Sequence, residues 1–408
     1  MHFLPILSAL KRHRTAAALI VLEIALTCAI VSNAVFLVGE RLSRMDKSSG
    51  IAEAELVRVH LTGVGKAPSD VDATTAQDLS ALRSIPGVRA AVSTNMIPFG
   101  NSSWNGNLST IRDDPAAPIK SSAMYMGGPD LLATLGVPLV AGRDFTLDEY
   151  VDLKGVEAET ARMASVIITR AVADVLFPGK NPLGQPMYAW GKEPQVVVGL
   201  IDHIARPDDS DSPLEAEYSV FLPIKAPYTV GGNYLLRVDP ARRAEILAAV
   251  DAPLARVDPH RIILDRQTFA EIRENYFRQD RAMAGLLVGV SIALLIVTAL
   301  GVIGLASFWV QQRTRQIGVR RALGATRGDI VRYFQTENLI LATFGIILGM
   351  ILAYAINQSL MGKYQIARLP AVFLPIGAGL LWTLGQIAVL GPALRASKIP
   401  PAIATRTV

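Results

Sequence analysis

The chain alternates between long uncharged apolar runs and a middle region of mixed polarity. Four runs reach the ~20 apolar residues that a helix needs to cross a bilayer. They occupy residues 16–39, 282–312, 338–362 and 369–394, and Glu23 is the only ionisable residue within them. The pattern predicts an α-helical membrane protein with four transmembrane helices, the first of them an uncleaved signal anchor.

The 242 residues at positions 40–281 show the short alternating patterns of a folded mixed α/β domain. Strand-like alternation at 57–61 and 88–94 flanks a helix-like spacing at 72–85. The same alternation recurs further along, with strands expected near 166–169, 195–201, 234–238 and 261–264, and helices at 171–177 and 241–254. We therefore expect a large extracytoplasmic mixed α/β domain on a helical stalk.

The stalk is expected from a helix that extends well beyond the bilayer. Thr268 and Glu271 form the T-x-x-E pattern of a capping box, and no proline follows until Pro370. A helix running unbroken to about residue 315 would reach about 70 Å, whereas the hydrocarbon core is only about 30 Å thick. The apolar stripe of this stalk comprises Leu42, Met45, Phe269, Ile272 and Tyr276. Alternatively, residues 269–283 pack on the outer domain and the helix breaks near Arg281.

The positive charges are concentrated in the segments that flank the predicted spans, as expected for a membrane protein. Only 18% of the residues are charged, against about 25% in soluble domains, and the formal net charge is +5. Residues 40–281 nevertheless carry 26 Lys and Arg against 32 Asp and Glu, so the basic excess lies outside this region. It lies at positions 11–14, in six arginines between 313 and 332, and at Arg395, Lys398 and Arg406. The positive-inside rule then places both termini in the cytoplasm, and nothing indicates nucleic-acid binding.

The residue types that carry catalysis or bind metals are sparse. Cys28, the single cysteine, lies within the first apolar run and is expected to be a small buried residue. The acidic segment 206–217 lacks the spacing of a calcium loop, so we expect a solvated loop and no metal. Neither H-E-x-x-H nor G-x-S-x-G occurs, and the adjacent Asp202 and His203 are expected to be a solvated pair. We therefore expect no enzyme.

The loop at residues 313–337 carries the most informative pattern. Ile317, Arg320, Arg321 and Leu323 fit a short helix that Gly324 can end by adopting a left-handed conformation. Thr326 and Asp329 would then cap a second helix. A short helix between two spans, with exposed arginines and a few apolar residues, suits a groove on a soluble partner. The alternative is a basic cytoplasmic loop without a partner.

These residues resemble a known family. The run R-Q-I-G-V-R-R-A-L-G-A-T at 315–326, the following 330–341 and the tail at 391–404 resemble the membrane domain of MacB-like and FtsX-like ABC transporter permeases. Within the middle region, residues 131–145, 177–185 and 196–200 resemble the MacB-type periplasmic domain. The resemblance covers nearly the whole chain and includes the four-span frame.

The resemblance implies a permease subunit that works as a dimer, with itself or with a related subunit. The loop after the second span would act as a coupling helix on a cytoplasmic ABC ATPase subunit. The contact would involve Ile317, Gly318, Arg320, Arg321, Leu323, Gly324, Ala325, Thr326 and Arg327. The family often has Glu where this chain has Gln316. No G-x-x-x-x-G-K-[ST] occurs, so ATP and Mg²⁺ are expected on a separate ATPase chain and no cofactor on this one.

The spans themselves argue against a wide polar pore, because Glu23 is their only ionisable residue. The G-x-x-x-G spacings at 285–289 and 345–349 would permit close helix approach. Our hypothesis is mechanotransmission in the bacterial inner membrane. Closure of the ATPase would move the coupling helix and the stalk, and the outer domain would expel a substrate already outside.

The resemblance suggests efflux or release of a peptide, antibiotic or lipoprotein, with a possible periplasmic adaptor and with lipid around the spans. The segment 395–408 would be a cytoplasmic tail. An alternative is an FtsX-like regulatory membrane protein that controls an extracytoplasmic partner such as a cell-wall hydrolase.

Overall fold

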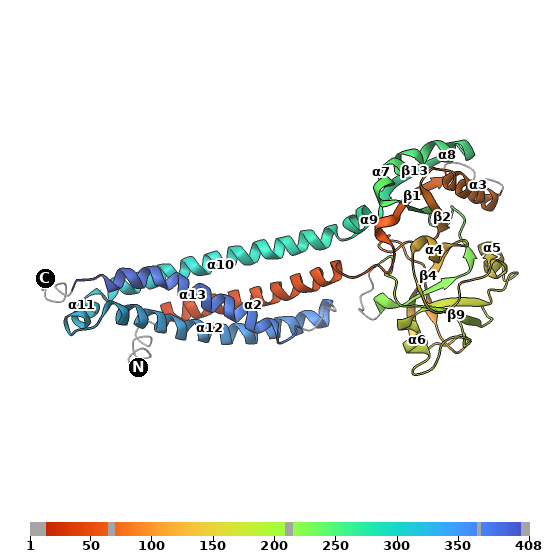
Figure 1. Cartoon of the computed structure of the whole chain (residues 1–408). Coiled ribbons are helices and arrows are strands. Elements are labelled where there is room, and N and C mark those ends of the chain that lie inside the picture. Colours follow the sequence, from red (N-terminus) through yellow and green to blue (C-terminus); the bar gives the residue numbers. More distant parts are fainter. Residues whose placement is uncertain (1–13, 64–69, 209–214, 365–368, 401–408) are drawn as a thin grey trace. The chain divides into compact units, whose positions relative to one another are not determined.

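The computed structural model describes residues 14–63, 70–208, 215–364 and 369–400 (Figure 1). The chain forms two compact units, one made of its two terminal parts up to Asp46 and from Gln279, and one made of Lys47–Arg278. Several residues that the sequence analysis used lie outside the described ranges, namely Lys11, Arg12, Asp209, Asp211 and Arg406.

The first unit consists of long helices. They are α2 (Arg14–Met45), α10 (Arg278–Gln312), α12 (Arg327–Tyr364) and α13 (Phe373–Ser397), with the short α11 (Thr314–Ala322) between α10 and α12. All four long helices are long and apolar enough to cross a membrane. This confirms the four predicted spans, although α2 and α12 extend beyond the uncharged runs.

Three of these helices, α2, α12 and α13, pack into one block. Its core contains Ile20, Ile24, Cys28, Leu341, Ala342, Ile346, Ala378 and Leu381. The glycines at 345 and 349 allow α12 to approach α2 closely. A Cβ at Gly345 would lie 2.8 Å from Ile24, and one at Gly349 would lie 2.5 Å from Cys28. The G-x-x-x-G spacing at 345–349 is therefore a contact within the chain, and Cys28 is the small buried residue that we expected.

Helix α10 is covered far less than its neighbours. Only 11% of its most apolar stretch is buried, against 56% for α2 and 33% for both α12 and α13. A Cβ placed at Gly285 or Gly289 would have no described atom within 4 Å, so the second G-x-x-x-G spacing faces open space. Its buried contacts with the block lie mainly in its second half, where Trp309 joins the core of the block and Val302 and Ala306 pack against Ala388 and Val389 of α13. Its polar contacts are few. Thr298 shares a hydrogen bond of 2.8 Å with Thr27, and Asp280 forms an ion pair with Arg41.

The second unit contains two sheets. The smaller sheet has the order β13 (Arg261–Thr268), β1 (Leu56–Gly63), β12 (Asn233–Val238) and β2 (Val88–Thr94), and all neighbours are antiparallel. Helices α3 (Val71–Arg83), α7 (Arg243–Ala249) and α8 (Asp251–Val257) supply residues to its core. The core contains Val57, Val59, Leu82, Tyr234, Leu236, Ile246 and Leu254. The sequence predicted one helix at 241–254, but the chain forms two, with Pro253 accommodated in the first turn of α8.

The larger sheet has the order β3 (Asn105–Leu108), β4 (Ile119–Met126), β10 (Ser219–Leu222), β7 (Ser165–Thr169), β9 (Gln195–Ile201) and β5 (Leu139–Gly142), with β8 (Pro186–Met187) also on β9. Strands β7 and β9 are parallel and are connected through α6 (Arg170–Leu176), which makes a βαβ arrangement. Short elements complete the unit: α4 (Leu131–Leu135), α5 (Leu153–Glu157), and the pair β6 (Val151–Asp152) and β11 (Ile224–Lys225).

Two of the glycine-containing segments that carry the family resemblance meet in this sheet. Gly142 on β5 lies opposite Gly199 on β9. A Cβ at Gly142 would lie 2.2 Å from the carbonyl oxygen of Val198, and one at Gly199 would lie 2.6 Å from that of Arg143. Gly142 also has φ of +81°, which favours glycine. Both positions therefore require glycine for the two strands to pair.

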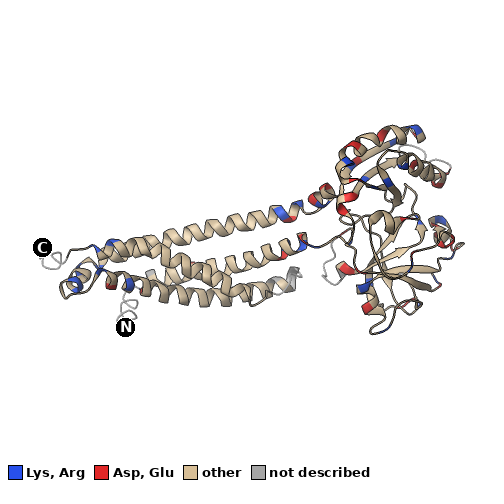
Figure 2. Cartoon of the chain, in the orientation of Figure 1, with Lys and Arg blue, Asp and Glu red and all other residues tan. Residues whose placement is uncertain are grey.

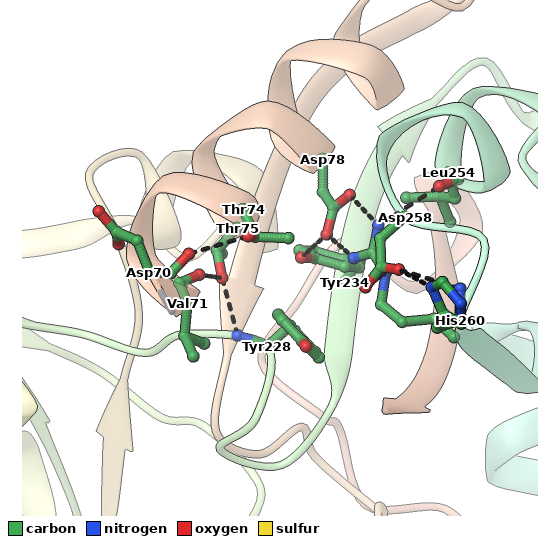
Figure 3. A network of polar contacts seen from close by, with 11 residues as sticks. Asp70, Val71, Thr74, Thr75, Asp78, Tyr228, Tyr234, Leu254, Asp258 and His260 are labelled. Atoms are coloured by element: carbon green, nitrogen blue, oxygen red, sulfur yellow. Dashed lines mark hydrogen bonds and ion pairs between the residues drawn. The ribbon is translucent and has the colours of Figure 1, made fainter. Parts of the chain in front are cut away.

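A buried polar network joins the helical layer to the smaller sheet (Figure 3). Asp78 on α3 is fully buried and accepts hydrogen bonds from Arg261 Nη2 at 2.6 Å and from the Tyr234 hydroxyl at 2.5 Å. Burial and the neighbouring Asp78 carboxylate raise the pKa of Tyr234 well above its usual range. Because Asp78, Tyr234 and Arg261 come from three different elements, the network fixes α3 on β12 and β13.

The long unbroken helix that the sequence predicted is not present. The Thr268–Glu271 capping box forms as expected, but α9 (Phe269–Tyr276) ends at Tyr276, Phe277 leaves the helical conformation, and α10 begins at Arg278. Phe269 and Ile272 are buried in the second unit, Lys47–Arg278, which is the outer unit. The ring centres of Phe269, Tyr276 and Phe277 lie 5.1–6.2 Å from the ring centre of Phe99. The alternative that residues 269–283 pack on the domain holds only for the segment up to Phe277, since residues 278–283 already belong to α10. The break therefore lies four residues before Arg281, and the apolar side chains before it pack on the domain instead of facing water.

Candidate functional site

Helix α11 forms where the short helix was predicted. Helix α10 ends at Gln312, and Arg313 adopts φ of −102° and ψ of 12°, which turns the chain before α11 starts at Thr314. The C-terminal end of α11 is closed by Gly324, whose φ is +98°. The Gly324 N–H donates to Arg321 O at 3.2 Å and the Ala325 N–H to Arg320 O at 3.0 Å. This pair of bonds is a Schellman motif, in which glycine adopts the left-handed conformation.

The next helix starts immediately after this turn. Thr326 and Asp329 cap α12 reciprocally: the Thr326 N–H donates to Asp329 Oδ2 at 2.9 Å, and the Asp329 N–H donates to Thr326 Oγ1 at 3.2 Å. The predicted cap is confirmed. Both ends of the loop between α11 and α12 are therefore fixed by local hydrogen bonds, and α11 is held in a defined orientation.

One face of α11 anchors it to the helical block. Ile317 is buried and belongs to a cluster with Ile330 and Phe334 of α12 and Ala393 and Ala396 of α13. Gly318 is also buried. These contacts seat α11 against two of the three packed helices.

The exposed surface of α11 combines arginines with apolar side chains. Leu323 is 82% exposed and Val319 is 43% exposed. The Arg320 guanidinium lies 4.5 Å from the centre of the Tyr333 ring, within the range of a cation–π contact. Figure 2 shows Lys and Arg gathered around α11, whereas the central parts of α10, α12 and α13 carry none. A short basic helix with a protruding leucine can bind an apolar groove that has an acidic rim.

The nine residues predicted for the contact differ in exposure. Those that face outward are Arg320, Leu323, Gly324, Thr326 and Arg327, while Arg321 and Ala325 are half-buried and Ile317 and Gly318 are buried. In this conformation the exposed members can reach a partner, and the buried pair supports the helix from behind. Gln316, where the family often has Glu, is exposed on α11.

Sequence reasoning missed the ion pair behind α11. Arg313 Nη1 donates to both carboxylate oxygens of Glu337, at 2.9 and 2.8 Å, and both side chains are buried. One signal was available in the sequence. Asp329 and Glu337 are the only acids among residues 311–337, and the cap explains only Asp329.

Asp202 and His203, in the outer unit, do not act on one another. Asp202 pairs with Arg170 at 2.8 Å, while His203 Nδ1 is bonded to the Glu217 carboxylate and Nε2 lies 2.7 Å from Ser48 O. The hydrogen bond with Glu217 raises the pKa of His203, and it lowers the pKa of Glu217. The expectation of a solvated Asp–His pair was therefore wrong for His203. In the described residues, no group of His, Cys, Asp and Glu is arranged to hold a metal ion.

Two family models match the chain. The MacB-like periplasmic core domain matches residues 17–252, and the FtsX-like permease C-terminal domain matches residues 288–401.

Among relatives, the pyoverdine export ATP-binding/permease protein PvdT of Pseudomonas entomophila is 27% identical, over 69% of this chain and 42% of that protein. The macrolide export ATP-binding/permease protein MacB of Campylobacter fetus is 25% identical, over 76% of this chain and 44% of that protein. This chain thus spans less than half the length of these two exporters.

A shorter relative matches over more of its own length. The uncharacterized ABC transporter permease YvrN of Bacillus subtilis is 26% identical, over 67% of this chain and 71% of that protein. Among solved structures, the periplasmic region of MacB from Actinobacillus actinomycetemcomitans aligns with 13% identity and a TM-score of 0.33, over 57% of this chain and 97% of that one. Because the periplasmic core domain model covers more than half of the residues and the permease model covers the last three spans, the chain belongs to the family of MacB-like and FtsX-like permeases.

Proposed function

We propose that the chain is the permease subunit of an ABC transporter of the mechanotransmission type. The observation that carries the proposal is α11. It is a short helix between two spans, anchored by the buried Ile317 and leaving Arg320 and Leu323 exposed. An ATPase outside these 408 residues would bind ATP and Mg²⁺ and dock on this surface. Its closure would displace α11 and thereby the helices attached to it.

The packing of the helical unit supports transmission of motion over transport through a pore. Helices α2, α12 and α13 form a block whose core is mainly apolar, with a few buried polar side chains such as Ser32, Glu337 and Asn357. Glu23, the only ionisable residue within the uncharged runs, is directed at α10, because a Cβ on Gly301 would lie 2.5 Å from its carboxylate. Such a block lacks the polar lining that a hydrophilic substrate requires.

The proposed topology follows the charge distribution. By the positive-inside rule, the arginines around α11 support a cytoplasmic position for this helix and for both termini in a bacterium, which would leave the α/β unit in the periplasm. The predicted stalk would consist of the outer ends of α2 and α10, with Leu42 and Met45 on the first, while Phe269, Ile272 and Tyr276 anchor α9 in the outer unit. Lipid would surround the remaining apolar surface.

A second permease, either another copy or a related subunit, would cover α10. This proposal is supported by the exposure of α10 and by the open spacing of Gly285 and Gly289, which would let a partner helix approach closely. The exposed Leu286, Ile292, Ile296 and Leu300 would otherwise face lipid.

The cargo is proposed only as a class. Two relatives are named for the export of macrolides and of pyoverdine, so we propose efflux or release of an antibiotic, peptide or lipoprotein from the periplasmic side. A periplasmic adaptor would serve such a system.

The proposed docking surface is tested by reversing its charge. The full chain would be purified with the ATPase that accompanies it from its own membranes, and the variant Arg320→Glu/Arg321→Glu compared with wild type. We expect at least a tenfold loss in stimulation of ATP hydrolysis, since charge reversal at a docking site costs more than 1.4 kcal/mol. Arg395→Glu, on the exposed face at the end of α13, serves as the matched control. Unchanged stimulation in the double variant, with normal membrane insertion, would remove α11 from the contact.

A further inference from the structure

The corner between α10 and α11 is held by a buried ion pair. Arg313 is the single residue between the two helices, and Glu337 lies within α12. The Arg313 side chain is 9% exposed and that of Glu337 is 1% exposed. Breaking a buried pair leaves an uncompensated charge in a medium of low dielectric, so such a pair fixes geometry strongly.

The surroundings of Glu337 are rich in hydrogen-bond donors. Several buried donors in the described residues have no hydrogen-bond partner, and three of them belong to Arg313 or to residues that line the cavity beside Glu337: Arg313 Nη2, Trp309 Nε1 and Asn338 Nδ2. Trp309, Glu337 and Asn338 line one cavity of about 10 Å³, and the Arg313 guanidinium lies 5.7 Å from the centre of a Trp309 ring. This surplus of donors favours an ionised carboxylate at position 337, because a neutral side chain would leave the guanidinium and these donors uncompensated.

The pair matters because α10 has few other polar ties; its remaining contacts with the block are apolar, through residues such as Trp309, Val302 and Ala306. Along its length, the described hydrogen bonds and ion pairs to α2 are Thr298 with Thr27 in the middle and Asp280 with Arg41 and Arg44 at the outer end. At the end nearest α11, the Arg313–Glu337 pair connects the end of α10 to the packed block. A displacement of α11 would therefore be transmitted to α10 through the corner at Arg313, which the ion pair with Glu337 fixes.

We propose that Arg313 and Glu337 are a positioning pair that keeps the α10–α11 corner rigid, so that movement of α11 displaces α10 instead of bending the chain at residue 313. This inference rests on the proposed coupling role of α11, but the rigidity of the corner is measurable without any ATPase. Neither residue contacts a partner in this proposal, since both are buried behind α11.

The rigidity is tested by distance measurements with spin labels. Cysteines replace the exposed Gln311 on α10 and Arg332 on α12 in a Cys28→Ala background, and labelled chains are diluted into unlabelled chains in lipid nanodiscs. Pulsed electron paramagnetic resonance then reports the width of the distance distribution. We expect a narrow distribution with the native pair and a width at least doubled by Glu337→Gln.

Two further variants distinguish a local effect on the α10–α11 corner from a general loss of folding stability. Arg313→Lys keeps the charge and should broaden the distribution less than Glu337→Gln, which adds a donor to a site with surplus donors. Glu149→Gln breaks the Arg143–Glu149 ion pair in the outer unit and should leave the width unchanged. A width in Glu337→Gln equal to that of the native chain would overturn the proposal. So would equal broadening by Glu149→Gln, which would mean that any loss of an ion pair loosens the chain.

A functional measurement distinguishes this proposal from the coupling role itself. With the ATPase that accompanies the chain, Glu337→Gln should bind within twofold of wild type but lose at least tenfold in stimulated ATP hydrolysis. Equal losses in binding and turnover would show that Glu337 only supports the docking surface, and would overturn the positioning role. If the wild-type chain binds no ATPase, the proposed function fails, whereas the distance measurement still decides whether the corner is rigid.

Discussion

Helices α10 and α12 look alike in sequence and differ in structure. Each contains an uncharged apolar run with one G-x-x-x-G spacing predicted from sequence, at 285–289 and at 345–349. In α12 the two glycines receive side chains and backbone of α2, whereas in α10 they face open space. The same pattern therefore marks an internal contact in one helix and an uncovered surface in the other. Small residues at this spacing permit close packing, but they do not specify the partner.

The largest effect should come from filling the two spacings with leucine. Gly349→Leu places a side chain where even a Cβ would lie 2.5 Å from Cys28, so it should destabilise the helical block by about 3 kcal/mol, at the upper end for overpacking. Gly289→Leu is the matched change on α10 and should leave the unfolding midpoint in detergent unchanged while weakening self-association at least tenfold. Equal destabilisation by both variants would mean that α10 is packed within the chain like α12.

A smaller effect is expected at the hydrogen bond in the middle of α10. Replacing Thr27 and Thr298 by valine, singly and together, should give a coupling energy of about 0.6 kcal/mol, which is the average for hydrogen bonds between helices in membranes. A double-mutant cycle on unfolding in detergent measures it. A coupling energy near zero would leave the ion pairs at the two ends of α10 as its only strong polar ties to the block.

The smallest effect concerns the segment that follows α2, which His203 holds in the outer unit. The pKa of His203 is raised above its ordinary value of 6.5, chiefly by the hydrogen bond to Glu217 and further by Ser48 O as the second acceptor, while burial and, less, Lys47 oppose the shift. A raised pKa in the folded state stabilises the fold fully below pH 6.5, and this contribution is lost as pH rises through the folded-state value. The lowered pKa of Glu217 adds stability above pH 4.5 that is lost as pH falls.

Hydrogen exchange in the full chain tests this contribution. Protection of the amides near Ser48 and Ile51, measured relative to Glu217→Gln at each pH, should decrease from pH 6 to pH 9. A constant ratio across that range would show that the charge of His203 does not hold the segment.

Sequence patterns predicted the helices and strands with strong periodicity. Strand β2 at 88–94, strand β9 at 195–201 and the capping box at Thr268 appear where they were expected, because alternation, flanking turns and caps are local signals. The break at Phe277 was not decided by local signals. It depends on whether Phe269 and Tyr276 have a surface to bury against, and Phe99, which provides that surface, lies about 170 residues earlier in the chain.

The candidate site was predicted in outline only. The helix at α11, its glycine end and the Thr326 cap followed from residue types at fixed spacing. Which of its residues face outward did not follow, because burial of Ile317 requires Ala393 and Ala396 from the far end of the chain. The Arg313–Glu337 pair was missed for the same reason. A sequence shows that two charges exist, but only the fold shows that both are removed from water.

The opposed glycines of β5 and β9 have one more consequence. The obstacle to a methyl group at Gly142 is a main-chain oxygen, and the same holds at Gly199, so trimming a neighbouring side chain cannot create space for either. A substitution at one position cannot be rescued by a second change opposite it. These two glycines are far apart in the gene, yet both must be retained. In random mutagenesis of the outer domain, second-site suppressors should be recovered for substitutions at most positions, but not for substitutions at these two glycines.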